Sequence, residues 1–389
     1  MSEVAGLDFT VNRSAWNETH WVESGISTDL APGQVLFRVD RFALTANNIT
    51  YAAAGDALGY WRFFPADAGW GRIPAMGFGD VIASTHGDIP VGTRCFGFFP
   101  MSRHLRIEPS TATATSIVDA AAHRAGLAPV YNQYQPIGGD PLYSADHEDE
   151  LMLLRGLFMT SFLAEDFLGE ADLHGARSVV ISSASSKTSI ALAFVVSQRA
   201  RAKAVGLTSA RNADFVKGLG FYDEVVTYDQ IGSLPAEIPS VFVDMAGNEK
   251  VSRTIHEHFR GHLTYSQRIG ATHWDAGGDA GELPGPKREF FFAPAQIKKR
   301  LAEWGPQGFQ ERLGASWTAF RDASRHWLTV QRSYGPAALE QVYAETLAGS
   351  ASPQLGHVIS VWEEEDSAAA WRSTGTPRSS STPGAGSGC

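Results

Sequence analysis

The chain has 389 residues, of which 43% are hydrophobic and 19% are charged. This composition is ordinary for a globular protein, and the length allows two domains that each bury a core. The formal net charge of −10 disfavours nucleic-acid binding, because phosphate backbones are bound by clusters of Lys and Arg. The 2 cysteines cannot build a disulfide framework or a four-cysteine zinc site.

The N-terminal sequence MSEVAGLDFTVNRSAWNE has neither a basic start nor an apolar segment, so we predict no signal peptide. No stretch of the chain approaches the roughly 18 uninterrupted apolar residues of a membrane-spanning helix. We therefore expect a cytoplasmic protein that binds neither nucleic acid nor a membrane.

The N-terminal part of the chain reads as strands and turns. Residues 34–50 alternate in the manner of a strand before a Thr/Asn turn. Between Pro74 and Pro100, short apolar runs are separated by Gly-Asp and Pro-Val-Gly-Thr turns, which predicts a small antiparallel barrel.

The middle of the chain alternates strand-like and helix-like segments, which predicts a parallel sheet. A long helix is expected before it, over Asp146–Leu168, and a mainly helical segment after it, over Ala295–Ala323. Gly356–Trp362 reads as a final strand that returns to the first domain. The expected strands of the sheet are Ser178–Ser182, Ala204–Leu207, Glu224–Thr227, Ser240–Asp244 and His262–Gln267, and the expected helices are Lys187–Arg199, Asn212–Leu219 and Glu249–Phe259.

These segments predict an α/β protein with a parallel-sheet domain and a β-barrel domain. The barrel domain is expected over residues 1–145, completed by about 325–372, and the sheet domain over 146–290. A helical segment is expected over 291–324. Residues 373–389 are rich in Ser, Thr, Gly and Pro, and predict a disordered tail.

The loop after the first sheet strand, SSASSKT over residues 182–188, lies where a dinucleotide-binding βαβ unit has its glycine-rich turn. The expected glycines are absent. Hydroxyls, backbone N–H groups at the helix start and a lysine can still bind a phosphate, although the serines can equally serve as helix caps. Walker A and serine-nucleophile interpretations lack their partner motifs. The predicted cofactor-binding residues of this loop are Ser182, Ser185, Ser186, Lys187 and Thr188.

The second strand ends in Thr208, Ser209 and Arg211, with no carboxylate before Asp214. Sites that prefer NAD place an Asp or Glu at this position to bind the ribose 2′-hydroxyl. Arginine and hydroxyl groups instead favour a 2′-phosphate, so NADP(H) is the predicted cofactor. The alternative is an ordinary helix start with a solvent-facing arginine.

Several strings together resemble one known superfamily. The segment Ala46–Tyr51 followed by Gly55 looks like a motif of zinc-free quinone reductases, and the serine-rich loop is similar to that of enoyl reductases. The chain thus resembles the medium-chain dehydrogenase/reductase superfamily over nearly its whole length. Within it, SSASSKTS, GLTSARN, LGFYDEVVTYD, VDMAGN and GATHW look like the divergent DUF2855 group.

The resemblance implies a Rossmann-type domain, a GroES-like barrel that carries catalytic residues, and a possible homodimer. The superfamily's zinc ligands are missing, since Met76–Gly79 stands where zinc enzymes have Gly-His-Glu. No metal site is therefore expected. Tyr51, Asn47 and His273 are the predicted catalytic residues, although Tyr51 can equally be packed at the domain seam and a structural hydrogen bond is the commoner role of such a histidine. Asp244 and Asn248 follow another strand at the predicted cofactor site.

The leading hypothesis is a zinc-independent, NADP(H)-dependent reductase of an activated C=C or carbonyl group in a small organic substrate. One alternative is a non-redox lyase, hydratase or retro-aldol enzyme on the same fold, which the missing glycines motivate. The other alternative is a non-catalytic nucleotide-binding protein.

Overall fold

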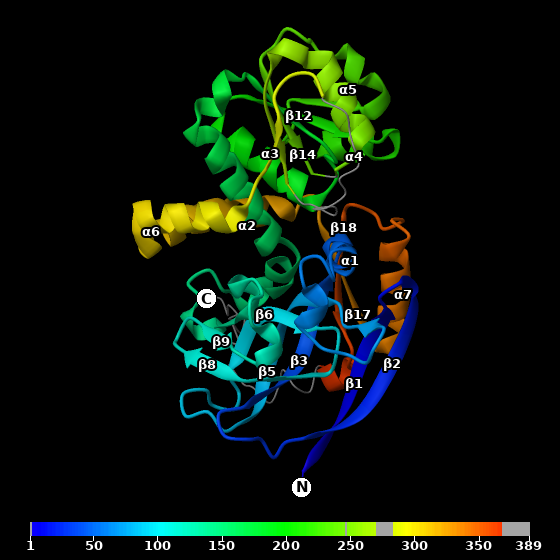
Figure 1. The fold of residues 1–389 in the computed structure, drawn as a ribbon, viewed down its shortest axis with the longest axis vertical. Helices are drawn as coiled ribbons and strands as arrows, with labels where there is room; N and C mark the ends of the chain where they lie inside the picture. Colours follow the sequence, from blue (N-terminus) through cyan, green and yellow to red (C-terminus); the bar gives the residue numbers. More distant parts are fainter. Residues whose placement is uncertain (1, 246, 270–282, 368–389) are drawn as a thin grey trace, which may run out of the picture.

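The computed structural model describes residues 2–245, 247–269 and 283–367. Figure 1 shows two lobes joined by a long helix, α2 (Glu148–Glu170), with the N-terminal strands in the lower lobe and the parallel sheet in the upper lobe. The last helix and the last two strands return to the lower lobe, beside the strands from the start of the chain.

The lower lobe is built around a mixed sheet whose central strands are antiparallel. A long hairpin at the N-terminus, β1 (Glu3–Asn12) with β2 (Ala15–Ser27), forms a separate sheet together with β4 (Trp70–Gly71). The core of the lower lobe is rich in aromatic side chains from several strands. The main sheet runs in the order β17 (Thr329–Tyr334), β18 (Leu355–Ser360), β3 (Val35–Leu44), β5 (Pro74–Ser84), β6 (Arg94–Pro100), β10 (Gln133–Pro136), β9 (Ile117–Asp119) and β8 (Pro109–Ala112), and β7 (His104–Ile107) pairs with β3.

The upper lobe is a six-stranded parallel sheet in the order β13–β12–β11–β14–β15–β16. β11, the first strand of this sheet along the chain, lies at the centre. The strand order reverses beside it, and ligands bind at such a point in parallel sheets. The central strands are fully buried apolar runs, as expected for strands covered on both faces. The strands are β11 (Ser178–Ile181), β12 (Lys203–Thr208), β13 (Glu224–Thr227), β14 (Ser240–Asp244), β15 (Leu263–Arg268) and β16 (Arg288–Phe290), and the helices between them are α3 (Lys187–Arg199), α4 (Ala213–Gly218) and α5 (Glu249–Phe259).

Helix α2 connects the two lobes through one continuous core. Its N-terminal half packs on β3, β5 and β18, and its C-terminal half packs on α3. Helix α6 (Ala293–Ser324) lies across α2 at the junction of the lobes (Figure 1). The apolar cluster around α2 includes Phe78 and Phe96 of the lower lobe together with Val179 and Ile190 of the upper lobe.

A buried network of charged groups fixes the N-terminus of α2 to the lower lobe. Arg94 of β6 donates hydrogen bonds to Glu148 (2.7 Å), Asp40 (2.7 Å) and Asp80 (2.9 Å), and Tyr143 donates to Glu148 (2.9 Å). Burial alone would raise the pKa of Asp40, but the charges of Arg94 and a neighbouring arginine hold it below its ordinary value. The network therefore keeps Asp40 ionised inside the core.

The C-terminal part of the chain adds two elements that the sequence analysis did not predict. Strand β17 pairs in parallel with β18, and helix α7 (Pro336–Leu347) connects them. The Thr/Asn segment that ends at residue 50, expected as a turn, is part of helix α1 (Ala46–Ala53). Thr45 starts this helix because its side chain accepts the N–H of Asn47 while the Asn48 side chain accepts the N–H of Thr45.

Candidate functional site

The loop between β11 and α3 lies at the carboxyl edge of the parallel sheet, and its serines hold its shape. The Ser182 hydroxyl donates to Asp244 (3.0 Å) and accepts the N–H of Met245 (2.8 Å), which fastens β11 to β14. Ser186 is the N-cap of α3 and accepts the N–H of Ser189. These two predicted cofactor residues therefore make structural hydrogen bonds within the protein.

Ser183 occupies the position in this loop where a glycine would be conformationally preferred. Its φ of 49° lies in the left-handed region, which costs a residue with a Cβ atom more than it costs glycine. Two tyrosines hold the loop in this conformation. The Ser183 N–H donates to the Tyr228 hydroxyl (3.0 Å), and the Tyr222 hydroxyl donates to the Ala184 carbonyl (2.9 Å).

Three backbone N–H groups remain free at the start of α3. Within the described part of the chain, the N–H groups of Ser185, Lys187 and Thr188 have no hydrogen-bond partner. They lie at the positive end of the helix dipole, where an anion is stabilised. The Ser185 hydroxyl accepts a hydrogen bond from the Asn212 side chain (2.9 Å), which connects this loop to the end of β12.

The side chain of Lys187 extends away from these free N–H groups. Its ammonium donates to the carbonyls of Leu355 (2.7 Å) and Pro353 (3.3 Å), and thereby connects the upper lobe to β18. Burial lowers the pKa of Lys187 to about 8. The geometry does not support the predicted role of the Lys187 ammonium as a phosphate ligand, because its hydrogen bonds are directed at the 353–355 segment.

This lysine predicts a pH dependence of stability. The folded-state pKa of Lys187, about 8, lies below its ordinary value of 10.5, so the unfolded chain binds more protons between these two values. Stability contributed by this group therefore rises as the pH increases from about 8 to 10.5. We expect Lys187→Met to remove that rise, measured as the difference between wild-type and variant melting temperatures across this pH range. If the difference between the two melting temperatures does not change with pH over this range, the burial of the Lys187 ammonium is contradicted.

The end of β12 presents one free cation. Thr208 is buried, Ser209 is half-buried and Arg211 is exposed. Within the described residues, the Arg211 guanidinium makes neither a hydrogen bond nor an ion pair with another side chain. It lies in the turn that also holds Asn212, whose side chain contacts the loop after β11. Arg211 is thus available to an anionic ligand beside that loop.

Asp244 and Asn248 organise the turn after β14. The two carboxylate oxygens of Asp244 accept from Ser182 and Gly247 on one side and from Ser252 on the other, at 3.0 Å each. The Asn248 side chain caps α5 by accepting the N–H groups of Lys250 and Val251 in the first turn of that helix. Their predicted contact with a cofactor stays a prediction, and His273 lies outside the described residues.

Tyr51 of α1 lies in a cluster of aromatic rings in the lower lobe. Its ring centroid is 4.7 Å from that of Tyr60, 5.4 Å from Phe98 and 6.4 Å from Tyr131. Burial raises the pKa of Tyr51 well above its ordinary value, and Tyr131 and Tyr60 add to the rise. The hydroxyl therefore stays protonated at physiological pH, so it can donate a hydrogen bond but cannot act as a base. Asn47, the other predicted catalytic residue of this helix, is exposed.

Sequence reasoning missed the neighbouring asparagine. Asn48 is buried and donates to the Pro74 carbonyl (2.8 Å), while its side-chain oxygen closes the cap of α1. The spacing Thr-x-x-Asn is the signal that could have identified both the cap and the helix.

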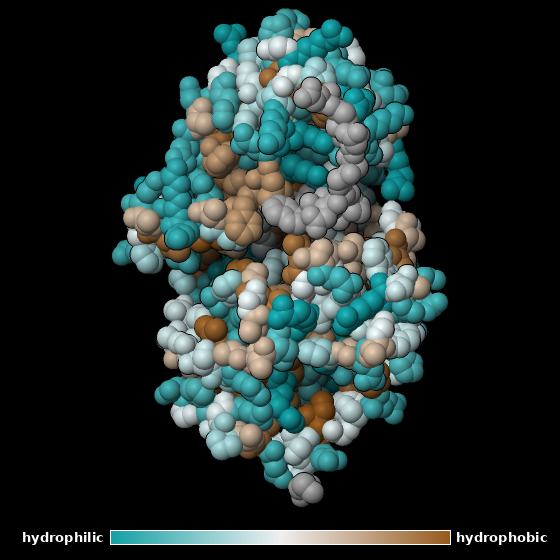
Figure 2. All heavy atoms as spheres, in the orientation of Figure 1, coloured by the Kyte–Doolittle hydropathy of each residue, from teal (hydrophilic) through white to brown (hydrophobic). Residues whose placement is uncertain are grey.

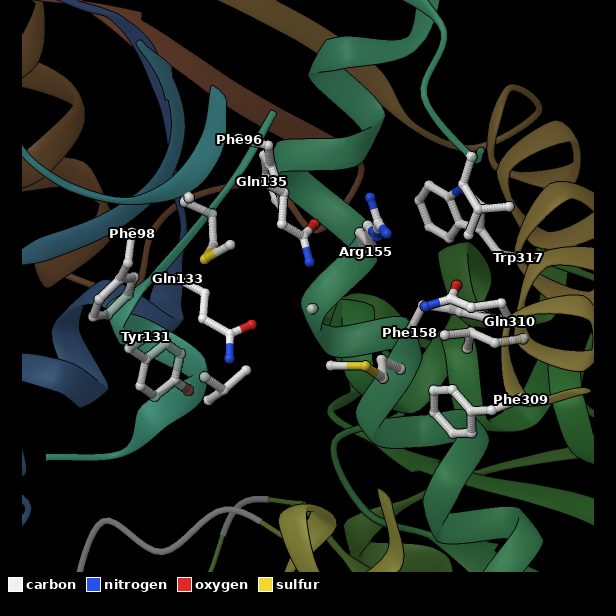
Figure 3. Close-up of a pocket in the computed structure, with 17 residues that line it drawn as sticks. Phe96, Phe98, Tyr131, Gln133, Gln135, Arg155, Phe158, Phe309, Gln310 and Trp317 are labelled. Carbon is white, nitrogen blue, oxygen red and sulfur yellow. The ribbon is translucent and has the colours of Figure 1, made fainter. Parts of the chain in front are cut away.

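A cavity of about 130 Å³ lies between the strands of the lower lobe and the two long helices. Figure 3 shows Gln133 and Gln135 of β10 on one side, with Arg155 of α2 opposite them, and Trp317 of α6 beyond α2. Of its lining residues, the sequence analysis singled out only Met76, since they come from five separated segments. In the space-filling view, apolar residues gather where the two lobes meet, whereas the upper lobe is mostly polar on the face that is shown (Figure 2).

Among the described residues, no group of three or more His, Cys, Asp and Glu side chains is placed to hold a metal ion. No helix within the described ranges has the length and apolar character needed to cross a membrane.

A family model described as a protein of unknown function, DUF2855, matches residues 42–352. The chain belongs to this family. The predicted membership is therefore confirmed, and the match covers strands of both lobes. No curated protein matches the sequence.

Several solved structures share the fold of this DUF2855 protein. CurA from Vibrio vulnificus, solved also with NADPH, aligns with a TM-score of 0.57 at 13% identity, over 91% of this chain and 98% of CurA. An enoyl thioester reductase from Candida tropicalis, in a mutant form, aligns with a TM-score of 0.51 at 11% identity, over 92% of this chain and 100% of the reductase. TarJ from S. aureus, in complex with NADPH, aligns with a TM-score of 0.52 at 10% identity, over 92% and 99%. These alignments confirm the predicted fold, with a Rossmann-type domain and a GroES-like domain.

Proposed function

We propose that this protein is a zinc-independent, NADPH-dependent reductase of an activated C=C or carbonyl group in a small organic molecule. The observation that carries the proposal is that two free groups lie at the carboxyl edge of the sheet: the N–H groups at the start of α3, and the guanidinium of Arg211 after β12. The structures of CurA and TarJ, solved with NADPH on the same fold, support it.

The residues at the carboxyl edge of the sheet fit a dinucleotide with a 2′-phosphate. The N–H groups of Ser185, Lys187 and Thr188 would hold the pyrophosphate, as helix N-termini commonly do. Arg211, with Ser209 beside it, would hold the 2′-phosphate, and no carboxylate of this turn opposes that charge before Asp214. Bound in this way, the cofactor supplies a hydride to the substrate.

The protein's own contribution lies in the lower lobe. A neutral Tyr51 hydroxyl would donate a hydrogen bond to the substrate oxygen and stabilise the negative charge that develops there. The apolar walls around it exclude water, which strengthens this hydrogen bond. Because the pKa of Tyr51 is raised, the proton stays on the tyrosine until the substrate oxygen becomes strongly basic.

A fluorescence titration with NADPH tests the proposal directly. We expect saturable binding in the micromolar range, and oxidation of the bound NADPH when an enone such as cyclohexenone is added. Absence of saturable binding at millimolar NADPH would overturn the proposal. Saturable binding followed by conversion of a substrate without loss of NADPH would instead support a non-redox enzyme.

The role of Tyr51 predicts a specific kinetic effect. We expect Tyr51→Phe to lower kcat by roughly 100-fold, the usual effect of removing one donor to a developing oxyanion, while KM changes little. Tyr60→Phe is the matched control, because it removes a hydroxyl from the same aromatic cluster. Steady-state rates of NADPH oxidation give both values. Equal effects of the two substitutions would contradict the assignment.

A further inference from the structure

We propose that the cavity between β6, β10, α2 and α6 is the substrate pocket, and that it takes an uncharged, planar ring compound with a carbonyl conjugated to the ring. This inference rests on the proposed reductase function for the reaction, but the binding preference follows from the cavity alone. The pocket is the one that Figure 3 shows.

Six of the 17 residues that line the pocket are aromatic. Phe96 and Phe98 of β6 lie on one side with Tyr131, and Phe158 of α2 and Trp317 of α6 lie on the other (Figure 3). Phe98 and Tyr131 are stacked, with ring centroids 4.4 Å apart and planes inclined by 23°. Flat walls of this kind favour a flat ligand, because stacked and edge-to-face contacts form only with another ring.

Two amide side chains supply the polar contacts inside the cavity, and a third lies at its rim. Gln133 and Gln135 alternate along β10, so both side chains lie on the same face of that strand, and Gln310 of α6 is exposed. Within the described part of the chain, none of these amides has a hydrogen-bond partner for its side chain. An amide can donate to a carbonyl or accept from a hydroxyl, so the ligand carries groups of this kind.

The pocket offers no uncompensated charge. Arg155 is the charged residue that lines it, and its guanidinium is paired with Asp140. A carboxylate or phosphate on the ligand would have to leave water without a free cation to receive it, which is costly in an apolar site. The lining therefore selects a neutral ligand over an anionic one of the same shape.

The size of the cavity fits one ring with its substituents directed toward the opening. Its volume is about 130 Å³. An engineered apolar cavity of similar size, about 150 Å³, binds benzene. Gly156 of α2 contributes to this space, since a Cβ atom added there would meet no other atom within 4 Å.

The pocket adjoins both parts of the proposed catalytic site. Phe98 and Tyr131 line it and also contact Tyr51, at centroid distances of 5.4 Å and 6.4 Å. On the other side, α2 continues from Gly156 to Ser161, whose hydroxyl donates to the Thr188 carbonyl (2.8 Å) in the first turn of α3. A ring in the pocket would thus lie between Tyr51 and the proposed nucleotide site.

Three probes separate charge from shape. Benzylideneacetone is a neutral aryl enone, cinnamate has the same skeleton with a carboxylate, and an alkyl enone of equal length lacks the ring. We expect calorimetric titration of the full-length protein, with and without NADPH, to give benzylideneacetone an affinity at least ~10-fold above both other probes. Equal affinities for the three probes, or no measurable binding of the aryl enone, would overturn the inference.

Gly156→Phe tests the location of the bound ring. The new side chain would fill the cavity, and a larger residue in place of glycine favours a helix interior, so the fold should be preserved. We expect the affinity for benzylideneacetone to fall at least ~10-fold while NADPH affinity and melting temperature are retained. Ala315→Phe, on an exposed position of α6, is the control and should bind like the wild type. Wild-type affinity in the Gly156 variant would place the ring elsewhere.

Gln135→Leu provides a second variant that does not fill space. Loss of one hydrogen bond to the ligand should weaken binding of the aryl enone by roughly 2-fold to 10-fold.

The proposed reductase function and the proposed substrate pocket fail in different ways. Binding of the aryl enone that Gly156→Phe abolishes, without any NADPH oxidation, would keep the pocket and refute the reductase. Oxidation of NADPH that Gly156→Phe leaves unchanged would keep the reductase and refute the pocket.

Discussion

Replacing Arg211 with alanine should weaken NADPH binding by roughly 10-fold to 100-fold and leave NADH binding almost unchanged. A charge-assisted hydrogen bond to a phosphate contributes about 1.5–3 kcal/mol, and only NADPH carries the 2′-phosphate. The exposed guanidinium of Arg211 is not engaged by any other described side chain, so its removal should not disturb the fold. Fluorescence titrations with the two cofactors give the affinities.

Lys217→Ala is the matched control for Arg211→Ala. Lys217 is an exposed residue of the next helix, α4, and its replacement removes one positive charge, as the replacement of Arg211 does. It should bind both cofactors like the wild type, apart from a small salt-dependent effect of net charge. Equal loss of NADPH and NADH affinity in the Arg211 variant would show that the arginine does not read the 2′-phosphate.

Replacing Arg94 with methionine should destabilise the protein by about 3–5 kcal/mol, the usual cost of removing one partner from a buried charge network. The substitution leaves three carboxylates, those of Asp40, Asp80 and Glu148, without the guanidinium that they share. Burial already raises the pKa of Asp80 even with Arg94 present. Chemical denaturation followed by tryptophan fluorescence measures the free energy of unfolding.

Arg106→Met serves as the control for the Arg94 variant. Arg106 is an exposed arginine of β7 whose side chain makes one hydrogen bond among the described residues, to the Ser27 carbonyl (3.2 Å), so its replacement should change stability by less than about 0.5 kcal/mol. A similarly small effect at Arg94 would mean that the network does not hold the N-terminus of α2 in the lower lobe.

The parallel sheet was predictable from local pattern. Its first five strands are short, mostly apolar runs, three helix-like segments lie between them, and Glu249–Phe259 is found with the predicted bounds. Periodicity and strand ends are local properties, which is why they are visible in a single sequence. The hairpin of β1 and β2 and the strand β17 were missed, because these long or exposed strands carry weak apolar alternation.

The direction of individual side chains could not be predicted in the same way. Lys187 follows a serine-rich loop and so looked like a phosphate ligand, but carbonyls about 170 residues further along the chain receive its ammonium. Gln133, Gly156 and Trp317 line one pocket although they are distant in sequence. Such arrangements depend on tertiary packing, which residue patterns do not encode locally.

Transfer of deuterium from NADPH labelled at the reactive carbon of its nicotinamide tests the central claim most directly. The protein is incubated with labelled NADPH and benzylideneacetone, and the product is examined by mass spectrometry. If the wild-type protein is a reductase that holds the substrate beside the nucleotide, its reduced product should carry one deuterium atom. After the same incubation time, the Tyr51→Phe and Gly156→Phe variants should not give this product. A product formed without deuterium, or no reduced product at saturating NADPH, would contradict the account.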